Sequence, residues 1–290
     1  MKYHVDGELV PAAEATVSVE DRGFQYGDAV FETMRAYGGS IFEWEAHAER
    51  LANSCDALGI DHGCTDTELR ERVRETLAAN SLADAYVKLS ISRGVQGGKL
   101  TPQSDADPTV VVIVDELPRG GVDGVDVWDE PAVVQTTKTR RVPDSAIPAD
   151  AKTHNYLNGI LARRELVEGA DEALLRDADG RVAEGATSNV FFVGDDGLHT
   201  PSLGGPVLPG ITRSVVIELA ESAEIPIHEG RYTPDDVRNA EEAFLTNTTW
   251  ELRPIETLDG IAVGGGPVTD LLSRLFDERV ERRHYGGDTA

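Results

Sequence analysis

The sequence predicts an α/β (α+β) protein built from two domains. Strand and helix patterns interleave along its 290 residues, and a segment rich in Pro and Gly, residues 117–121, separates them into two parts. A chain of this length can bury two hydrophobic cores. We therefore expect a small N-terminal domain of residues 1–117, a linker of residues 118–124 and a larger C-terminal domain of residues 125–290.

The first half is predicted to combine strands with two helices. Residues 85–92 alternate between apolar and polar side chains, which is typical of a half-buried strand. Thr65 and Glu68 form a capping box, which indicates the start of a helix. The predicted strands are 30–37, 41–42, 85–92 and 109–114; a turn is predicted at 38–40, and helices run through 48–58 and onward from Thr65.

The second half is predicted to contain further strands and three helices. Asp179–Gly180 indicates the turn between two paired strands. An apolar strand follows Glu184, and another begins near Phe244. The predicted helices are 155–167, 212–223 and 267–284.

The charge balance excludes several classes of partner. Fifty-two acidic residues oppose 27 basic ones, which gives a formal net charge of −25. Such a surface repels phosphates, so we expect no nucleic-acid or anionic-membrane partner. Only five residues are lysines, and together with the acid excess this suggests a protein from a salt-in halophile. The lysines are Lys2, Lys88, Lys99, Lys138 and Lys152.

Other features of the composition narrow the class further. No stretch approaches the ~20 apolar residues of a membrane helix, and the N-terminus has no apolar leader, so we expect a cytoplasmic protein. Cys55 and Cys64 cannot make a disulfide framework. The seven histidines are scattered, which predicts no metal site.

Several polar positions are candidates for chemistry. Lys152, at the mouth of a predicted helix, suits a nucleophilic amine that reaches a cofactor. Glu184 could keep a pyridine nitrogen protonated, although its spacing alone fits a surface glutamate in a strand connection equally well. Leu208–Pro–Gly–Ile–Thr opens a helix whose amides could bind phosphate, although a plain N-cap at Thr212 explains the same residues. Arg50, on the polar side of its predicted helix, could hold a phosphate as a planar fork.

Taken in order, these pieces resemble the class IV aminotransferases. The resemblance covers about residues 3–256 and is far more specific jointly than any motif alone. Its landmarks are residues 21–28 (DRGFQYGD), Phe31–Glu32, residues 47–51 (HAERL), Lys152 with Asn155, Glu184–Gly185 with Ser188–Asn189, residues 208–213 (LPGITR) and the Thr-rich strand of residues 244–254.

The resemblance implies a fold, a cofactor and roles for individual residues. The fold would be fold-type IV, similar to D-amino-acid aminotransferase, with pyridoxal 5′-phosphate (PLP) between the two domains of a homodimer. Lys152 would bind PLP as a Schiff base and shuttle the proton, and Glu184 would pair with the pyridine nitrogen. Arg50, Ile211, Thr212 and Thr248 would hold the phosphate. Ser188 and Asn189 would also contact the cofactor, whereas Tyr156 matches only loosely a tyrosine of the branched-chain enzymes.

The resemblance leaves three functions open, and transamination between an amino acid or amine and a 2-oxo acid is the one we predict. The alternatives are 4-amino-4-deoxychorismate lyase activity, which gives p-aminobenzoate and pyruvate, and a catalytically silent relative. The Arg-x-His motif of the D-amino-acid enzymes is absent from residues 93–99. The predicted substrate residues are Tyr26, Phe31, Thr33, Arg35, Tyr86, Lys88 and Thr249.

The substrate residues themselves point in two directions. Tyr26, Phe31, Arg35 and Tyr86 match pocket positions of branched-chain aminotransferases. Lys88 stands where those enzymes carry arginine. Thr33 stands where they carry glycine, and the lyases carry a threonine there. Residues 88–94 and 245–247 also resemble the lyases, whereas residues 248–251, with Thr249, look more like the transaminases. The role of Arg93 stays open.

Overall fold

A computed structural model describes residues 1–103, 107–119 and 128–286 of the chain, and these form two compact units. The first unit contains Met1–Arg119, Ala151–Asn155 and the described residues from 283 onward. The second contains the described residues from 128 to 150 and Tyr156–Arg282. Each unit is described by itself below.

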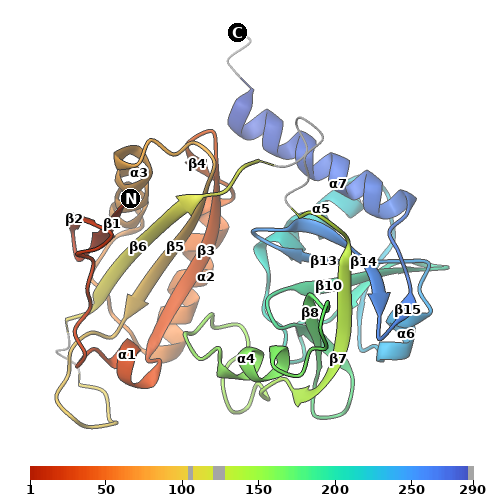
Figure 1. Cartoon of the computed structure of the whole chain (residues 1–290), viewed down its shortest axis with the longest axis horizontal. Coiled ribbons are helices and arrows are strands. Elements are labelled where there is room, and N and C mark those ends of the chain that lie inside the picture. Colours follow the sequence, from red (N-terminus) through yellow and green to blue (C-terminus); the bar gives the residue numbers. More distant parts are fainter. Residues whose placement is uncertain (104–106, 120–127, 287–290) are drawn as a thin grey trace. The chain divides into compact units, whose positions relative to one another are not determined.

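The first unit is built on an antiparallel sheet of six strands in the order β2-β1-β6-β5-β3-β4 (Figure 1). One face of this sheet is covered by α2 and α3, whose apolar side chains form a core with those of the strands. The strands are β1 Lys2–Val5, β2 Glu8–Pro11, β3 Ala29–Tyr37, β4 Ser40–Ile41, β5 Ala85–Ser92 and β6 Thr109–Glu116; the helices are α1 Arg22–Tyr26, α2 Trp44–Leu58 and α3 Asp66–Ala79.

The second unit contains a mixed sheet of nine strands within the described residues, in the order β12-β11-β10-β13-β14-β7-β8-β9, with β15 paired to β14. The pairs β11–β12, β14–β7 and β7–β8 are parallel. The strands are β7 Ala132–Arg140, β8 Glu172–Arg176, β9 Val182–Gly185, β10 Asn189–Gly194, β11 Gly197–Pro201, β12 Ile227–Gly230, β13 Glu242–Asn247, β14 Glu251–Leu258 and β15 Ile261–Ala262. The helices are α4 Leu157–Arg163, α5 Ile211–Ser222, α6 Pro234–Arg238 and α7 Pro267–Val280, and a π-helical turn, η1 Glu281–Tyr285, follows α7.

Local sequence signals account for most of these elements. The capping box of α3 has both of its hydrogen bonds, from Glu68 N to Thr65 Oγ1 and from Thr65 N to Glu68 Oε2. In β5 the apolar residues of the predicted alternation are all buried. Gly180, with φ of +86°, forms the predicted turn between β8 and β9. The predicted returning strand, residues 41–42, is displaced by one residue in β4.

One predicted helix is too long. Residues 155–167 were expected to be helical, but α4 spans only Leu157–Arg163. The chain leaves the helix because Glu165 turns to β7, where its carboxylate accepts the backbone N–H groups of Lys138 and Thr139. Gln135 fixes the same segment by accepting Val167 N and donating to Glu165 O. Contacts with β7 therefore replace the last turns of the predicted helix.

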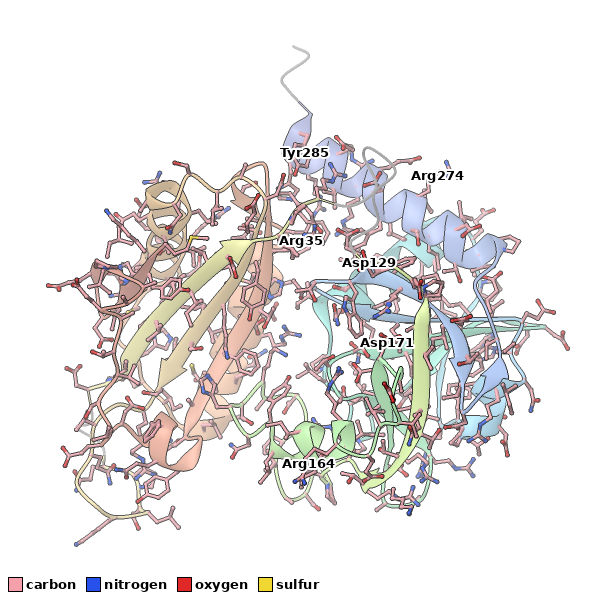
Figure 2. The ribbon with its side chains drawn as sticks, viewed as in Figure 1. Arg35, Asp129, Arg164, Asp171, Arg274 and Tyr285 are labelled. Atoms are coloured by element: carbon pink, nitrogen blue, oxygen red, sulfur yellow. The ribbon has the colours of Figure 1, made fainter. Side chains whose placement is uncertain are left out.

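The two units do not follow the predicted boundaries at every point. Residues 151–155 were placed in the C-terminal domain, yet Thr153 forms a β-bridge with Val30 of the first unit. The described residues from 283 onward also belong to the first unit, where His284 Nδ1 lies 2.7 Å from Ser40 Oγ and Tyr285, labelled in Figure 2, is hydrogen-bonded to Asp84. Most of the predicted linker, residues 118–124, lies outside the described residues. No helix in the described part of the chain is long and apolar enough to span a membrane.

Candidate active site

Strand pairing brings five predicted substrate residues to one face of the first unit's sheet. In the register of β3 and β5, Phe31 lies opposite Ser90, Thr33 opposite Lys88, and Arg35 opposite Tyr86. Side chains two residues apart share a face, and the intervening residues of both strands belong to the core beneath α2 and α3. The face opposite those helices, called the open face below, therefore carries Phe31, Thr33, Arg35, Tyr86 and Lys88.

Lys152 belongs to the same face. Its segment runs antiparallel along β3, because Phe31 N donates to Lys152 O at 2.9 Å and His154 N donates to Ala29 O at 2.8 Å. This register places the side chains of Lys152 and His154 on the side of Phe31. The Lys152 Nζ lies 4.7 Å from the centre of the Phe31 ring.

Three basic groups gather around Phe31. The Lys88 Nζ lies 4.6 Å from the ring centre, and the His154 ring meets Phe31 edge-on at 5.3 Å. Burial, followed by the charge of Lys152, lowers the pKa of Lys88. Burial and then the charge of Lys88 lower the pKa of His154 to about 4, so its imidazole is neutral at pH 7. His154 was not among the predicted site residues, although its spacing of two from Lys152 could have indicated it.

The residues beside Thr33 complete the open face. Burial raises the pKa of Tyr86, and a hydrogen bond between the Tyr86 and Thr33 side chains partly offsets that effect. Arg35, labelled in Figure 2, is buried, and its Nη2 donates to Pro118 O at 2.6 Å. Its guanidinium also lies 4.9 Å from the centre of the Tyr37 ring. Arg35 is thus held by the protein itself, unlike the half-buried Lys88.

Arg50 lies on the opposite side of β3 from Lys88, on the polar side of α2 as predicted, but that side is buried. Its side chain is buried and forms a fork on Glu32, with Nε at 2.8 Å from Oε1 and Nη2 at 2.6 Å from Oε2. His47 Nδ1 lies 2.7 Å from the same Oε2. The alternation of β3 turns Glu32 toward α2, which carries both partners.

This buried cluster is electrostatically compensated. Burial alone would raise the pKa of Glu32, but the charge and hydrogen bonds of Arg50, helped by His47, lower it to about 2. Burial lowers the pKa of His47 despite its contact with Glu32. The helix that carries Arg50 is also tied to Lys152, since Ser54 Oγ accepts Lys152 N at 3.0 Å. Sequence reasoning noted Glu32 and His47 only as parts of motifs and did not predict their contact.

Tyr26 and Arg93 are both linked to Arg22, Tyr26 by packing and Arg93 through a shared carboxylate. Tyr26 ends α1, is partly exposed, and packs its ring 5.2 Å from the Arg22 guanidinium carbon. Arg93 is buried and shares the carboxylate of Asp28 with Arg22, through contacts of 2.8 and 2.7 Å. Arg22 also donates to the carbonyls of Lys99 and Leu100. These arginines fix the loop that follows β5, which gives Arg93 a structural task.

In the second unit, Glu184 is held in one orientation. Arg141 Nε donates to Glu184 Oε1 at 2.6 Å, and Leu208 N donates to Oε2 at 2.9 Å. The carboxylate is only slightly exposed, and an ion pair with arginine favours its charged form. Arg141 was not predicted, because nothing in the sequence links a residue at the end of β7 to β9. The contact with Leu208 joins Glu184 to the loop that opens α5.

The N-terminus of α5 has the features of an anion site. Its N-cap is Gly210, which offers no side-chain hydrogen bond, so the alternative of a Thr212 N-cap is wrong. Asn189 Nδ2 donates to Leu208 O, and a Cβ at Gly210 would come within 2.0 Å of Asn189 Oδ1. The amides of Ile211 and Thr212 open a helix of 12 residues, whose positive end favours an anion.

Two further polar segments lie at neighbouring strand ends. Ser188 Oγ donates to the buried Glu172 at 3.3 Å. Asn247 Oδ1 accepts Thr249 N, Thr249 Oγ1 and Trp250 N, which fixes the turn that carries Thr248 and Thr249. Thr246, opposite Asn189 in the sheet, is buried with no hydrogen-bond partner for its Oγ1 in the described chain. Uncapped amides, hydroxyls and an oriented carboxylate make a donor and acceptor set that fits a phosphorylated pyridine.

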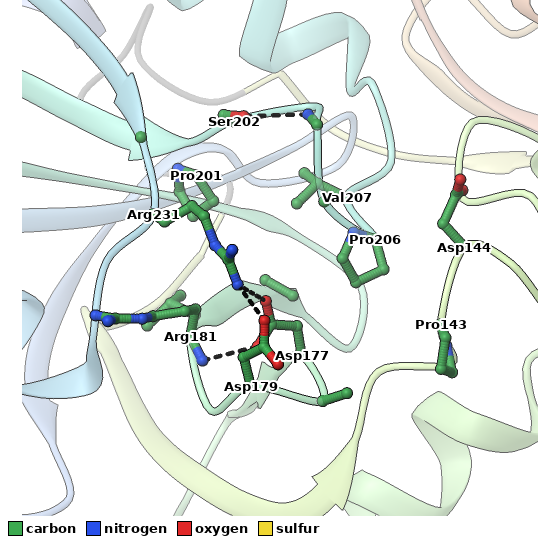
Figure 3. A pocket seen from close by; sticks show the side chains of 16 residues that line it. Pro143, Asp144, Asp177, Asp179, Arg181, Pro201, Ser202, Pro206, Val207 and Arg231 are labelled. Carbon is green, nitrogen blue, oxygen red and sulfur yellow. Dashed lines mark hydrogen bonds and ion pairs between the residues drawn. The ribbon is translucent and has the colours of Figure 1, made fainter.

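The second unit also contains a cavity of about 330 Å³ beside this region. Figure 3 shows Arg231 reaching across it to Asp177 and Asp179, at 3.3 and 2.6 Å. Ala183 and Val207 line the cavity and adjoin Glu184 and Leu208 in sequence. Among the described residues that line it, none is a predicted site residue, so it is distinct from the groups above. In the described residues no cluster of three His, Cys, Asp or Glu side chains could hold a metal ion.

The fold and these groups fit an enzyme that binds a phosphorylated pyridine, and comparison with known proteins identifies the family. Residues 29–258 match the family model "Amino-transferase class IV", and the chain belongs to this family of PLP-dependent enzymes. It is 38% identical to a putative branched-chain-amino-acid aminotransferase of Methanocaldococcus jannaschii, over 99% of this chain and 98% of the relative. It is 34% identical to a D-alanine aminotransferase of Listeria monocytogenes, with 97% of both chains covered.

Solved structures agree with this assignment. The branched-chain aminotransferase of Thermoproteus uzoniensis, solved with norvaline, matches with a TM-score of 0.89 and 32% identity, covering 97% of this chain and 94% of that one. The 4-amino-4-deoxychorismate lyase of Pseudomonas aeruginosa matches with a TM-score of 0.83 and 29% identity, covering 95% and 98%. The predicted fold-type IV architecture and the predicted enzyme class are confirmed.

Proposed function

We propose that this aminotransferase binds PLP through Lys152 and exchanges amino groups between an amino acid or amine and a 2-oxo acid. The observation that carries the proposal is the position of Lys152, whose backbone is fixed to β3 and α2 while its amine lies over Phe31 on the open face. A fixed lysine amine can hold the cofactor and then move a proton at the substrate Cα. PLP, when bound, supplies the electron sink.

The remaining cofactor residues form two groups: one would contact the pyridine ring of PLP and the other its phosphate. Glu184, held by Arg141 and Leu208 N, would accept a hydrogen bond from the ring nitrogen and keep that nitrogen protonated. The amides of Ile211 and Thr212 would bind the phosphate, with Arg50 and Thr248. Ser188 and Asn189, which donate to Glu172 and to Leu208 O, would also contact the cofactor.

The substrate carboxylate would be bound by Lys88. Its ammonium is half-buried and, among the described residues, lies against the Phe31 ring without a carboxylate or hydrogen-bond partner. Taking such a charge out of water is costly, and an anionic substrate would offset that cost. Phe31, Thr33, Arg35 and Tyr86 would line the same pocket, with Tyr26 and Thr249 as further substrate residues.

The lyase alternative rests on one observation of this face. Thr33 lies directly opposite Lys88, so a hydroxyl and an ammonium stand side by side where a carboxylate-bearing substrate could use both. The test is a panel of L-branched-chain amino acids and D-alanine with 2-oxo acids, run beside 4-amino-4-deoxychorismate. We expect new 2-oxo acids. Pyruvate with p-aminobenzoate, and no amino transfer, would establish the lyase instead.

We propose that the protein is a homodimer. In the first unit α1 and the loop after β5 expose Phe24 at 69% and Leu100 at 74%; in the second, α4 exposes Leu157 at 65% and Ile160 at 55%. Apolar groups of this size on a chain of charge −25 are best explained by a covering partner, and a second copy is the simplest one. Sedimentation velocity should give twice the chain mass, and a monomer at all concentrations would contradict the proposal.

We also propose a halophilic, cytoplasmic enzyme. The charge of −25 with only five lysines supports the first point. Cys55 and Cys64 are both unbridged, which suits a reducing compartment. The free energy of unfolding and the activity should both increase from low salt to molar KCl, because screening shortens the range of carboxylate repulsion to about 3 Å. Equal stability without salt would contradict the halophilic origin.

A further inference from the structure

Glu172 is a fully buried carboxylate that the proposed chemistry does not use. It begins β8, is 0% exposed, and its Oε1 accepts Ala173 N at 2.8 Å and Arg163 Nη1 at 3.1 Å. Its Oε2 accepts Thr187 N at 3.2 Å, Thr187 Oγ1 at 2.6 Å and Ser188 Oγ at 3.3 Å. Three of its five donors therefore come from the short bend that joins β9 to β10.

The bend, residues 186–188, is braced from several sides. Ala186 N donates to Ala173 O at 2.9 Å, and Asn247 Nδ2 donates to Thr187 O at 3.3 Å. Gly185 N donates to Ser188 O at 2.7 Å, and a Cβ at Gly185 would come within 2.1 Å of Ser188 Oγ. The Ser188 side chain therefore lies directly against Gly185, where nothing larger than glycine fits.

The bend lies between two of the proposed cofactor residues, so the hydrogen bonds that hold it also affect their positions. Glu184 lies two residues before the bend, in β9, and Asn189 lies directly after it, in β10. Asn189 donates to Leu208 O, and the same loop residue donates its N–H to Glu184. A shift of the bend would therefore move Glu184 relative to the loop that opens α5 at Gly210.

We propose that Glu172 is a positioning residue for the cofactor, which holds the 186–188 bend so that Glu184 and the amides of α5 match the ring nitrogen and phosphate of one bound molecule. The inference rests on the proposed function. Loss of hydrogen bonds to the Glu172 carboxylate should lower the free energy of unfolding, but that effect alone would show only a structural role. The distinguishing property is cofactor affinity.

The second unit offers a matched control in Glu242. This carboxylate is also buried, and like Glu172 it accepts both the N–H and the hydroxyl of one threonine, although it has no arginine partner in the described part of the chain. Its donors are Val268 N at 3.0 Å, Thr269 N at 2.7 Å and Thr269 Oγ1 at 2.7 Å. Glu172→Gln and Glu242→Gln each replace an acceptor by an amide that faces the N–H and hydroxyl of a threonine. Both changes should destabilise the fold, whereas only the first should reach the proposed cofactor residues.

The experiment measures the PLP dissociation constant of the full-length chain by absorbance titration, together with the urea midpoint without cofactor. We expect Glu172→Gln to raise the constant at least about tenfold and Glu242→Gln to change it less than about twofold. Equal changes in the two variants, or an unchanged constant in Glu172→Gln, would overturn the inference. Should Glu172→Gln not fold, Thr187→Val and Thr269→Val form a milder pair with the same expected contrast.

A wild-type chain that does not bind PLP would instead refute the proposed function. The two failures are thus separate: in one case the wild type lacks the cofactor, and in the other the wild type binds it while the two glutamate variants behave alike. A lower PLP affinity in Glu172→Gln at the same urea midpoint as Glu242→Gln would be the clearest support.

Discussion

The two faces of the sheet at β3 differ in how their buried charges are compensated. On the face toward α2, Glu32 is surrounded by Arg50 and His47 at 2.6 to 2.8 Å, and its pKa falls to about 2. On the open face, Lys88 packs against an aromatic ring, and within the described residues no carboxylate faces it. The burial of both groups is substantial, so the difference lies in their partners.

The comparison teaches which charges belong to the fold and which to the ligand. A buried ion pair with all its partners is part of the folded state, and breaking it leaves an uncompensated charge. A half-buried cation without a partner is expensive on its own and is suited to bind an anion from solution. In a chain that has nearly excluded lysine, two of five lysines lie at Phe31 of the open face.

The largest expected effect comes from removing the amine of Lys152. Lys152→Ala should reduce amino transfer by about a thousandfold or more, because the amine proposed to hold PLP and to move the proton is lost. The measurement is the single-turnover rate with the best amino donor. Lys138→Ala, at an exposed position of β7, is the control. If Lys152→Ala kept more than a percent or so of the rate without added amine, the assignment of Lys152 would be wrong.

Breaking the buried ion pair between Glu32 and Arg50 should lower the stability of the fold. Glu32→Gln removes the partner of Arg50 and should lower the free energy of unfolding by about 3–5 kcal/mol. Since the folded pKa of Glu32 is below its ordinary value of 4.5, its contribution is present above that value and is lost as the pH falls toward about 2. Urea unfolding at pH 7 and pH 3 measures this.

The variant should thus differ most from wild type at pH 7 and less at pH 3. Glu71→Gln is the control, because Glu71 forms an exposed ion pair with Arg74 and should change the midpoint little. A variant with wild-type stability at pH 7 would mean that the Glu32 cluster is not a stabilising part of the fold.

Removing the Lys88 ammonium should affect substrate binding and not stability, the reverse of the effect expected for Glu32→Gln. Lys88→Met should leave the free energy of unfolding unchanged or slightly higher, since no ion pair is broken and a desolvated charge disappears. The KM of the carboxylate substrate should rise about 10- to 100-fold, as expected for a lost hydrogen bond to a charged group. Destabilisation comparable to that of Glu32→Gln, with an unchanged KM, would remove the distinction between the faces.

The smallest effect separates the two leading functions. Thr33→Val removes the hydroxyl opposite Lys88 and its hydrogen bond with Tyr86. In a transaminase the rate should fall less than about tenfold, the value of an ordinary hydrogen bond. In a lyase that hydroxyl could relay a proton, and p-aminobenzoate formation should fall about 100-fold or more. Parallel assays of both reactions on this variant decide between them.

The sequence predicted the elements and one face of the site well, for local reasons. The alternation of residues 85–92 and the β3 pattern together place Phe31, Thr33 and Lys88 on one face once the strands pair. Glu184 could be proposed from the sequence because its motif is compact. Arg141, Glu172 and His154 were missed, since their partners lie on other elements and depend on sheet order, which no local pattern contains.

The errors in the prediction have the same origin. Arg50 lies on the polar side of its helix as predicted, but the burial of that side was not predicted, because it depends on the pairing with Glu32 of another element. Helix α4 ends early because Glu165 finds partners on β7, which the helical pattern cannot indicate. Thr212 is not the N-cap, because Gly210 takes that position beside Asn189.

The central claim, that Lys152 holds the cofactor, is tested most directly by reducing the PLP-loaded protein with borohydride and mapping the labelled peptide by mass spectrometry. Reduction makes the bond between lysine and cofactor permanent. We predict one phosphopyridoxyl group per chain, on Lys152. A label on Lys2, Lys88, Lys99 or Lys138, or no label at all, would contradict the account.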